Sequence, residues 1–223
     1  MFDDINVNME AIKHFTKANS DFRIPFKQNV WMQLFLLVFM LIWAMTLIGT
    51  TDHYNWLLEN ALPIVFMIIL PISMKRYQFS DLSLLMIFVY LCLHVYGAQY
   101  TYAENPFGFW LKDLFHSSRN HYDRIVHFSF GFVLAYPMRE LFIDCLKLPK
   151  TLAWIIPIEI SLSISGLYEL IEWAVADLLF KSQGVAYLGI QGDVWDAQKD
   201  MFLAFSGALI GSSLISILEK KQA

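Results

Sequence analysis

The chain of 223 residues has little charge and almost no cysteine. Only 16% of its residues are charged, and the only cysteines are Cys92, in an apolar run, and Cys145, in a polar connection. This pattern predicts neither a disulfide framework nor a thiolate metal site. The net charge is −4, and no basic patch is interleaved with aromatic residues, so nucleic acid is excluded as a partner.

Apolar residues, in contrast, make up 57% of the chain. A helix crosses about 30 Å of hydrocarbon with roughly 20 mostly apolar residues. Runs near this length recur along the chain, too long for the strands of a membrane barrel, which alternate over about 10 residues. The sequence therefore predicts an all-α fold, a polytopic helical membrane bundle of about six transmembrane helices. The predicted spans are residues 30–49, 57–74, 82–98, 122–142, 152–180 and 201–218.

These runs have short connections and no evident internal repeat, which predicts one membrane domain over residues 30–218. Residues 1–29 are predicted to form a cytoplasmic amphipathic segment, because Phe2 starts an apolar stripe at helical spacing among basic residues. Residues 219–223 form a predicted cytoplasmic tail. With both termini inside, eleven of the 16 lysines and arginines are cytoplasmic and five are external, which favours an N-in, C-in topology.

The longest connection, residues 99–121, then lies outside the membrane. Asn105 can cap a short helix that Pro106 opens, and the aromatic residues that follow lie on one face. Two interpretations stay open: an interfacial anchor, which the aromatic composition favours, or a lid over a polar site.

Ionisable residues of four predicted helices gather at their outer ends under this topology. Asp123 and His127, like Asp196 and Asp200, are four residues apart. Glu169 and Glu172, like Asp193 and Asp196, are three residues apart. The two members of each pair can therefore share a helix face. The set is His94, Asp123, His127, Glu169, Glu172, Asp193, Asp196 and Asp200. Ionisable residues within membrane segments are rare and usually face the bundle interior, which favours a functional site. Spaced glycines after Asp200, at Gly207 and Gly211, allow close helix packing, so this face is expected to point inward.

Structural roles explain several of these residues individually. Asp193 and Asp196 suit an N-cap and a first-turn acid, stabilised by the helix dipole. Asp123 suits a cap, His127 a packed and hydrogen-bonded residue, and His94 a partner for a tyrosine. Such roles do not explain Asp200, which lies a further turn inward.

The functional hypothesis gives each residue a role. His127 is a general acid/base or a ligand, Asp196 and Asp200 are ligands or bases, and Glu169 or Glu172 is a base or an orienting group. Gathered carboxylates repel one another unless they are protonated, paired with a base or bound to a cation. Arg124 and Lys199 are candidate counter-ions, and Asp123, Arg124 and Asp193 are supporting residues.

A divalent metal ion is the other way to neutralise such a cluster. Imidazole with carboxylate suits zinc, iron or manganese, and carboxylates alone suit magnesium, calcium or manganese. The candidate ligands are His94, His127, Asp196 and Asp200. No HExxH motif supports this set.

The segments "YDRIVHFSFGF", "YELIEW" and "QGDVWDAQKDM" resemble the YjdF-like family of uncharacterised bacterial inner-membrane proteins. The resemblance covers nearly the whole chain and implies an inner-membrane location. It implies no established activity.

A more distant similarity is to VanZ-like membrane proteins, which are associated with glycopeptide resistance. Their Asp-Lys-x-x-His-Phe start of a helix is matched by Asp123, Arg124, His127 and Phe128, with arginine for lysine. Glu169 or Glu172 matches a later acidic position. Their Asp-x-x-x-Asn before spaced glycines is matched by Asp196 and Asp200, with aspartate for asparagine, and an arginine that precedes it in that family has no counterpart in "YLGIQGDVW".

Three functions remain open from the sequence. The leading hypothesis is a site open to the outer leaflet that binds or acts on a lipid, a lipid-linked sugar or an envelope precursor. The second is transport of a cation or protons, favoured by Glu159, about 15 Å deeper along its helix than Glu169. The third is a noncatalytic scaffold in which the polar cluster only locks the bundle.

Overall fold

The computed structural model describes residues 24–74, 77–179 and 188–222, and every regular element within these ranges is helical. The predicted all-α fold is confirmed. The apolar stripe expected from Phe2 onward lies outside the described residues, so the segment 1–29 stays a prediction. The domain boundaries at residues 30, 218 and 219 also stay predictions.

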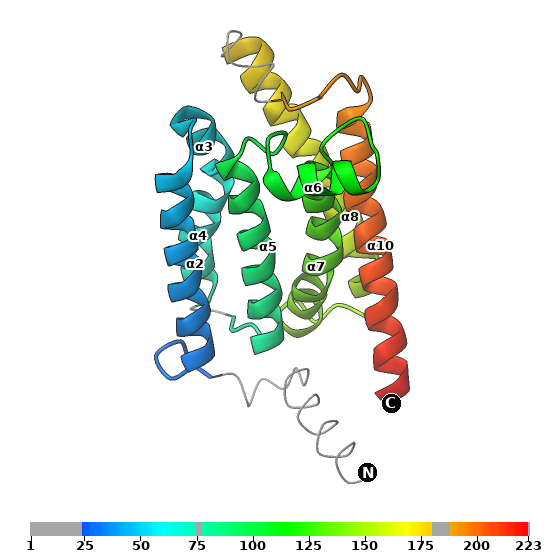
Figure 1. Cartoon of the computed structure of the whole chain (residues 1–223). Helices are drawn as coiled ribbons and strands as arrows, with labels where there is room; N and C mark the ends of the chain where they lie inside the picture. The colour runs from blue at the N-terminus through cyan, green and yellow to red at the C-terminus, as the bar shows by residue number, and fades with distance from the viewer. Residues whose placement is uncertain (1–23, 75–76, 180–187, 223) are drawn as a thin grey trace, which may run out of the picture.

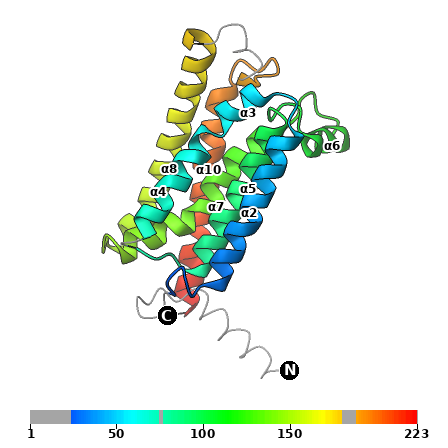
Figure 2. The same cartoon turned by 90° about the vertical axis from the view of Figure 1, so that its left-hand side faces the viewer.

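The chain forms a bundle whose long helices run alternately up and down (Figures 1 and 2). Helix α2 begins at the same end of the bundle at which α10 ends, and the opposite end, with α6 and the start of α10, is the upper end in Figure 1. The elements are α2 (Val30–Gly49), α3 (His53–Glu59), α4 (Ala61–Met74), α5 (Asp81–Gln99), α6 (Pro106–Leu114), α7 (Tyr122–Asp144), α8 (Lys150–Trp173), its π-helical continuation η2 (Ala174–Leu179) and α10 (Asp196–Gln222).

Four of these helices are long and apolar enough to cross a membrane, namely Val30–Gly49, Asp81–Gln99, Lys150–Leu178 and Asp196–Glu219. The bent pair of α3 and α4 adds a fifth if it counts as one span. Helix α7 has 23 residues but carries charged residues at both ends, and it is not among them. A multi-pass membrane protein is therefore established, while the sixth span and the N-in, C-in orientation stay predictions.

The second predicted span is broken near the upper end. Its two halves, α3 and α4, meet at 42° around Asn60, which is fully buried. Pro63 follows in the first turn of α4 and has no N–H, so the carbonyl of Glu59 cannot receive the usual helical bond from that position. His94 of α5 supplies a substitute, because its Nε2 lies 3.0 Å from that carbonyl oxygen.

Helix α7 lies in the middle of the bundle and packs against α5, α8 and α10 (Figure 1). Its contact with α10 is backbone to backbone. A Cβ atom added at Gly131 would lie 1.9 Å from the carbonyl oxygen of Ala204, and one at Gly207 would lie 2.2 Å from that of Phe128. The expectation that the glycine face of α10 points inward is confirmed, and Gly131 is the matching residue on α7.

The lower end of α7 is held by two buried side chains. Glu140 accepts hydrogen bonds from the Tyr77 hydroxyl at 3.0 Å and the Ser83 hydroxyl at 2.7 Å. Arg139 donates to both carboxylate oxygens of Glu219 on α10, at 3.0 and 2.7 Å. These bonds fix α7 along its axis relative to α5 and α10, and so fix the height of its upper end.

We expect Gly131→Ala to destabilise the protein more than Gly166→Ala. Both glycines lie within helices, but a Cβ at Gly166 meets only the flexible end of Met201, at 3.1 Å. Overpacking typically costs about 1–3 kcal/mol, whereas alanine in place of a helical glycine gains roughly 0.5–1 kcal/mol. Thermal unfolding in mild detergent measures both. Equal midpoints for the two variants would show that α7 and α10 do not pack this closely.

Candidate functional site

The upper end of the bundle carries a layer of ion pairs around the starts of α7 and α10. Arg119, in the loop before α7, binds Asp196 with both terminal nitrogens, and both residues are buried. Arg124 contacts Asp193 and also lies 3.3 Å from Asp196. Lys199 approaches Asp193 at 2.6 Å. Arg124 and Lys199, predicted as counter-ions, therefore pair with Asp193 and Asp196.

Local backbone geometry places these charges. Gln191 exchanges two hydrogen bonds with the backbone of Asn120, at 2.9 and 3.0 Å, which joins the loop before α10 to the loop before α7. Gly192 has φ of +83°, a conformation that favours glycine. Asp193 follows, and its side chain accepts from the N–H of Trp195 at 3.2 Å, as an aspartate does in a turn before a helix.

Two titratable groups of this layer lie outside the helices. The hydrogen bond from Lys199 is the main cause that holds the pKa of Asp193 well below its usual range. Burial, followed by the charges of Arg124 and Arg119, lowers the pKa of His121. Asp193 is therefore ionised and His121 neutral near pH 7, so the layer's positive charge comes from arginine and lysine.

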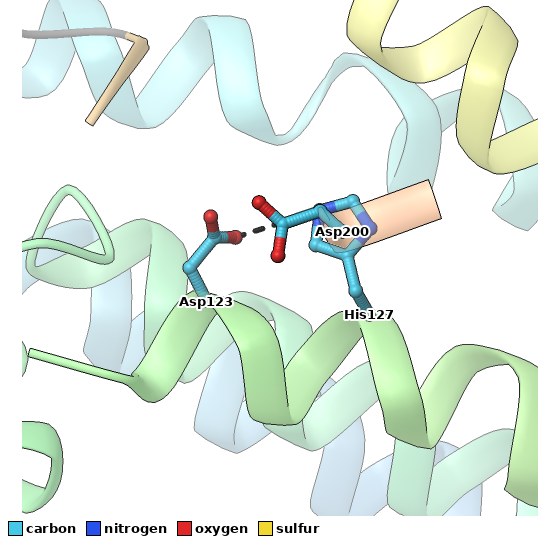
Figure 3. Close-up of side chains that lie close together, drawn as sticks. All are labelled: Asp123, His127 and Asp200. Atoms are coloured by element: carbon cyan, nitrogen blue, oxygen red, sulfur yellow. Dashed lines mark ion pairs between the residues drawn. The ribbon is translucent and has the colours of Figure 1, made fainter. Parts of the chain in front are cut away.

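A second group lies below the paired charges, where α7, α8 and α10 meet. Asp123 and His127 project from α7 toward Asp200 of α10 (Figure 3). One possible ligand atom from each of the three lies within 4.8 Å of the others. The Nε2 atom of His127 is 3.5 Å from a carboxylate oxygen of Asp123 and 3.5 Å from one of Glu169. We call Asp123, His127, Glu169 and Asp200 the acidic site.

Helix α8 orients the acidic site from one side. The Ser165 hydroxyl lies 3.2 Å from Nδ1 of His127, so it fixes the plane of the ring. The ring of Tyr168 meets that of His127 edge to face at 6.0 Å. Glu169 and Glu172 contact each other through their side chains. The two glutamates thus both lie at this end of the bundle, with Glu169 the one that contacts His127.

His94 is the predicted ligand that the structure does not bring into the acidic site. Its Nε2 donates to the carbonyl oxygen of Glu59, and its Nδ1 lies 2.7 Å from the hydroxyl of Tyr102. Both ring nitrogens are therefore engaged, Nε2 with the broken span and Nδ1 with the loop after α5. Asp196, another predicted ligand, is engaged by Arg119.

Sequence reasoning missed two charged residues of this region. Glu59 is buried at the end of α3 and accepts a hydrogen bond of 2.7 Å from Tyr168. Its signal was an acidic residue inside the predicted span 57–74, four residues before Pro63. Arg119 appeared only as one of several external cations, because nothing in the sequence pairs it with Asp196, 77 residues away.

A cavity of about 520 Å³ runs from the acidic site down between α4, α5, α7 and α8. At its upper end it is lined by polar residues, among them Asp123, His127, Ser165 and Tyr168. The rest of the lining is almost entirely apolar and reaches Tyr77 and Phe79 near the lower end. Volumes of about 300–1,000 Å³ are typical of sites for small ligands.

Helix α6 begins as predicted. The Asn105 side chain accepts from the N–H groups of Phe107 and Gly108, and Pro106 opens the helix. Its apolar residues point away from the bundle, since Trp110 is 56% and Leu114 is 54% exposed. This exposure fits the interfacial anchor better than a lid, which would turn these side chains toward the site.

Comparison with known proteins agrees with this architecture. The family described as "Predicted membrane protein (DUF2238)" matches residues 31–221. The chain is 38% identical to "Inner membrane protein YjdF" of Escherichia coli (strain K12) over 172 residues, which cover 76% of this chain and 81% of that protein. No solved structure matches the chain.

The fold and these matches define a multi-pass helical membrane protein. The chain belongs to the DUF2238 family of predicted membrane proteins. The matched region includes residues of every long helix described above. The resemblance to the YjdF-like family is confirmed. The similarity to VanZ-like proteins and the roles of the site residues stay predictions.

We expect Arg119→Met to lower the stability of the folded protein sharply. It leaves Asp196 buried with only its 3.3 Å contact to Arg124. Breaking a buried ion pair costs about 3–5 kcal/mol. Lys199→Met is the matched control, because Lys199 is 49% exposed and an exposed pair contributes at most about 1 kcal/mol. Thermal unfolding in detergent compares them, and a similar small loss in both would show that the buried pair does not hold the layer together.

Proposed function

We propose that this protein binds a membrane lipid or a lipid-linked envelope precursor, with the lipid chain in the cavity and the head group at the acidic site. The observation that carries this proposal is the cavity of about 520 Å³ whose lining is polar at one end, at Asp123 and His127, and almost entirely apolar elsewhere. This distribution matches an amphiphile, and a pocket for a wholly polar solute would not need it.

Access from the bilayer supports the same assignment. Among the lining residues, Val65 and Ile69 of α4 and Ile164 of α8 are 49%, 52% and 43% exposed, so the cavity wall reaches the surface of the bundle. Helices α4 and α8 lie on the same face of the bundle in Figure 2, and within the described residues no extensive backbone contact joins α4 to α8. A lipid chain can therefore pass between α4 and α8 from the membrane.

The acidic site offers the groups that such a head group needs. His127 can act as an acid, a base or a ligand, with Glu169 beside its Nε2. Asp123, which lines the cavity, can accept hydrogen bonds from hydroxyl or amine groups. Asp196 and Asp193, bound to arginine and lysine, position the start of α10. In an inner membrane with both termini inside, this site faces the outer leaflet, where envelope precursors are handled.

The two other hypotheses have less support. Glu159, the residue that favoured transport, is exposed on α8 and does not line the cavity. A noncatalytic scaffold would use the polar cluster only to hold the helices together. That role does not need a cavity beside the cluster. Transport and scaffold functions are outcomes that the following experiment can reveal.

We expect Leu134→Trp to remove bound lipid. Leu134 lines the cavity, so a larger indole there occupies the volume of the lipid chain. Leu209→Trp is the matched control, because Leu209 lies on α10 and is 37% exposed. The full chain is reconstituted in nanodiscs of bacterial polar lipids, returned to mild detergent and weighed by native mass spectrometry.

The parent and Leu209→Trp are expected to retain a lipid that Leu134→Trp loses. Equal retention by all three, at equal folded yield, would show that the cavity holds no lipid. Flux of a cation in proteoliposomes that disappears with Glu159→Gln would instead favour transport.

A further inference from the structure

The contacts of the His127 Nε2 atom with two carboxylates are longer than ordinary hydrogen bonds. Its Nε2 is 3.5 Å from both the Asp123 and Glu169 carboxylates, whereas N–H···O hydrogen bonds are about 2.7–3.2 Å long. Two ligands of one tetrahedral zinc ion, each at about 2.0–2.1 Å, lie about 3.4 Å apart. The separations therefore fit atoms that share an ion better than atoms that share a proton.

Asp200 gives an independent indication. Its side chain is 2% exposed, and its Oδ1 has no hydrogen-bond partner within the described part of the chain. The carboxylate faces Asp123 and His127 (Figure 3). A buried carboxylate oxygen without a partner is strongly unfavourable, and a second carboxylate nearby adds repulsion. A cation between them removes both costs.

The basic side chains of the upper layer do not supply this cation. Arg119 is bound to Asp196, and both Arg124 and Lys199 are bound to Asp193. The paired layer and the acidic site are thus distinct, although both include acids of α10. Within the described part of the chain, no lysine or arginine forms an ion pair with Asp123, Glu169 or Asp200.

We propose that Asp123, His127 and Asp200 bind a divalent metal ion of the zinc, manganese and iron class. One imidazole with carboxylates is the ligand set that these ions accept. Nε2 of His127 is the free ligand atom, because Nδ1 can donate to the Ser165 hydroxyl at 3.2 Å, and such a partner fixes the tautomer of a metal-binding histidine. Glu169 lies at the edge of the site, as a further ligand or an orienting group.

This metal site revises the ligand set expected from the sequence. It keeps His127 and Asp200, adds Asp123, and leaves out His94 and Asp196, whose polar atoms are engaged elsewhere. Three protein ligands leave a position open for an oxygen of a bound molecule. The inference rests on the proposed function for that molecule, which would be the phosphate or ester oxygen of the lipid head group.

The test uses the full-length protein in mild detergent, stripped with a chelator and then incubated with Zn²⁺ alone. After desalting, metal is measured by mass spectrometry of the elements, and thermal unfolding is followed with and without Zn²⁺. The parent and Glu159→Gln, an exposed acid outside the site, are expected to retain about one ion per chain and to unfold at a higher temperature with Zn²⁺.

Asp200→Asn and His127→Gln are expected to lose the ion and the Zn²⁺-dependent rise. Asp200→Asn should not unfold earlier than the parent when metal is absent, because it removes a buried charge. Glu169→Gln is expected to weaken Zn²⁺ binding about 10–100-fold. An earlier unfolding of metal-free Asp200→Asn would instead indicate a purely structural role for this carboxylate.

The outcomes separate this inference from lipid binding. Leu134→Trp is expected to keep Zn²⁺ and lose lipid, whereas Asp200→Asn loses Zn²⁺. If the parent binds no Zn²⁺ above the level of Asp200→Asn, the metal site is overturned, and lipid retention by the same parent still tests the proposed function. If metal binds and lipid does not, the proposed function fails alone.

Discussion

The close approach of α7 and α10 is the constraint on which the upper end of the bundle depends. Gly131 and Gly207 let the two backbones touch, and any Cβ at either position would overlap a carbonyl oxygen. At this separation, acidic residues at the start of α7 lie within a few ångströms of acidic residues at the start of α10. Wider packing would leave Asp123 and Asp200 in separate environments, and no common site would form.

Because α7 and α10 lie so close together, their carboxylates repel one another. The surroundings of these carboxylates differ at two depths. Near the surface, the loops before α7 and α10 bring Arg119 and Arg124 to Asp196 and Asp193, so those charges are matched within the protein. One turn deeper, no basic side chain of the described residues is paired with Asp200, and its Oδ1 has no hydrogen-bond partner there. Asp200 faces Asp123 and His127, which line the upper end of the cavity, so an ion bound by these residues would lie next to a head group in the cavity.

Residues that look alike in the sequence consequently make different contacts in the structure. Asp196 and Asp200 are one helical turn apart, yet Asp196 serves an ion pair and Asp200 faces the site. His94 and His127 show the same division, since His94 repairs a helix broken before Pro63 while His127 keeps Nε2 directed at carboxylates. Glu140 and Arg139 at the lower end maintain the register of α7 on which this division rests.

The sequence by itself determined the all-α membrane fold, the inward glycine face of α10 and the cap of α6, because these depend on run length, periodicity and near neighbours in the chain. It also predicted that Asp123, His127, Glu169 and Asp200 gather, since each of their helices begins or ends at the same side of the membrane. Only the tertiary structure decided which charges pair. Arg119 reaches Asp196 across 77 positions, Glu59 meets Tyr168 across 109, and His94 fills a bond left by a proline in another helix. Such pairings depend on interhelical distance and rotation, and helical periodicity within each segment carries no record of either.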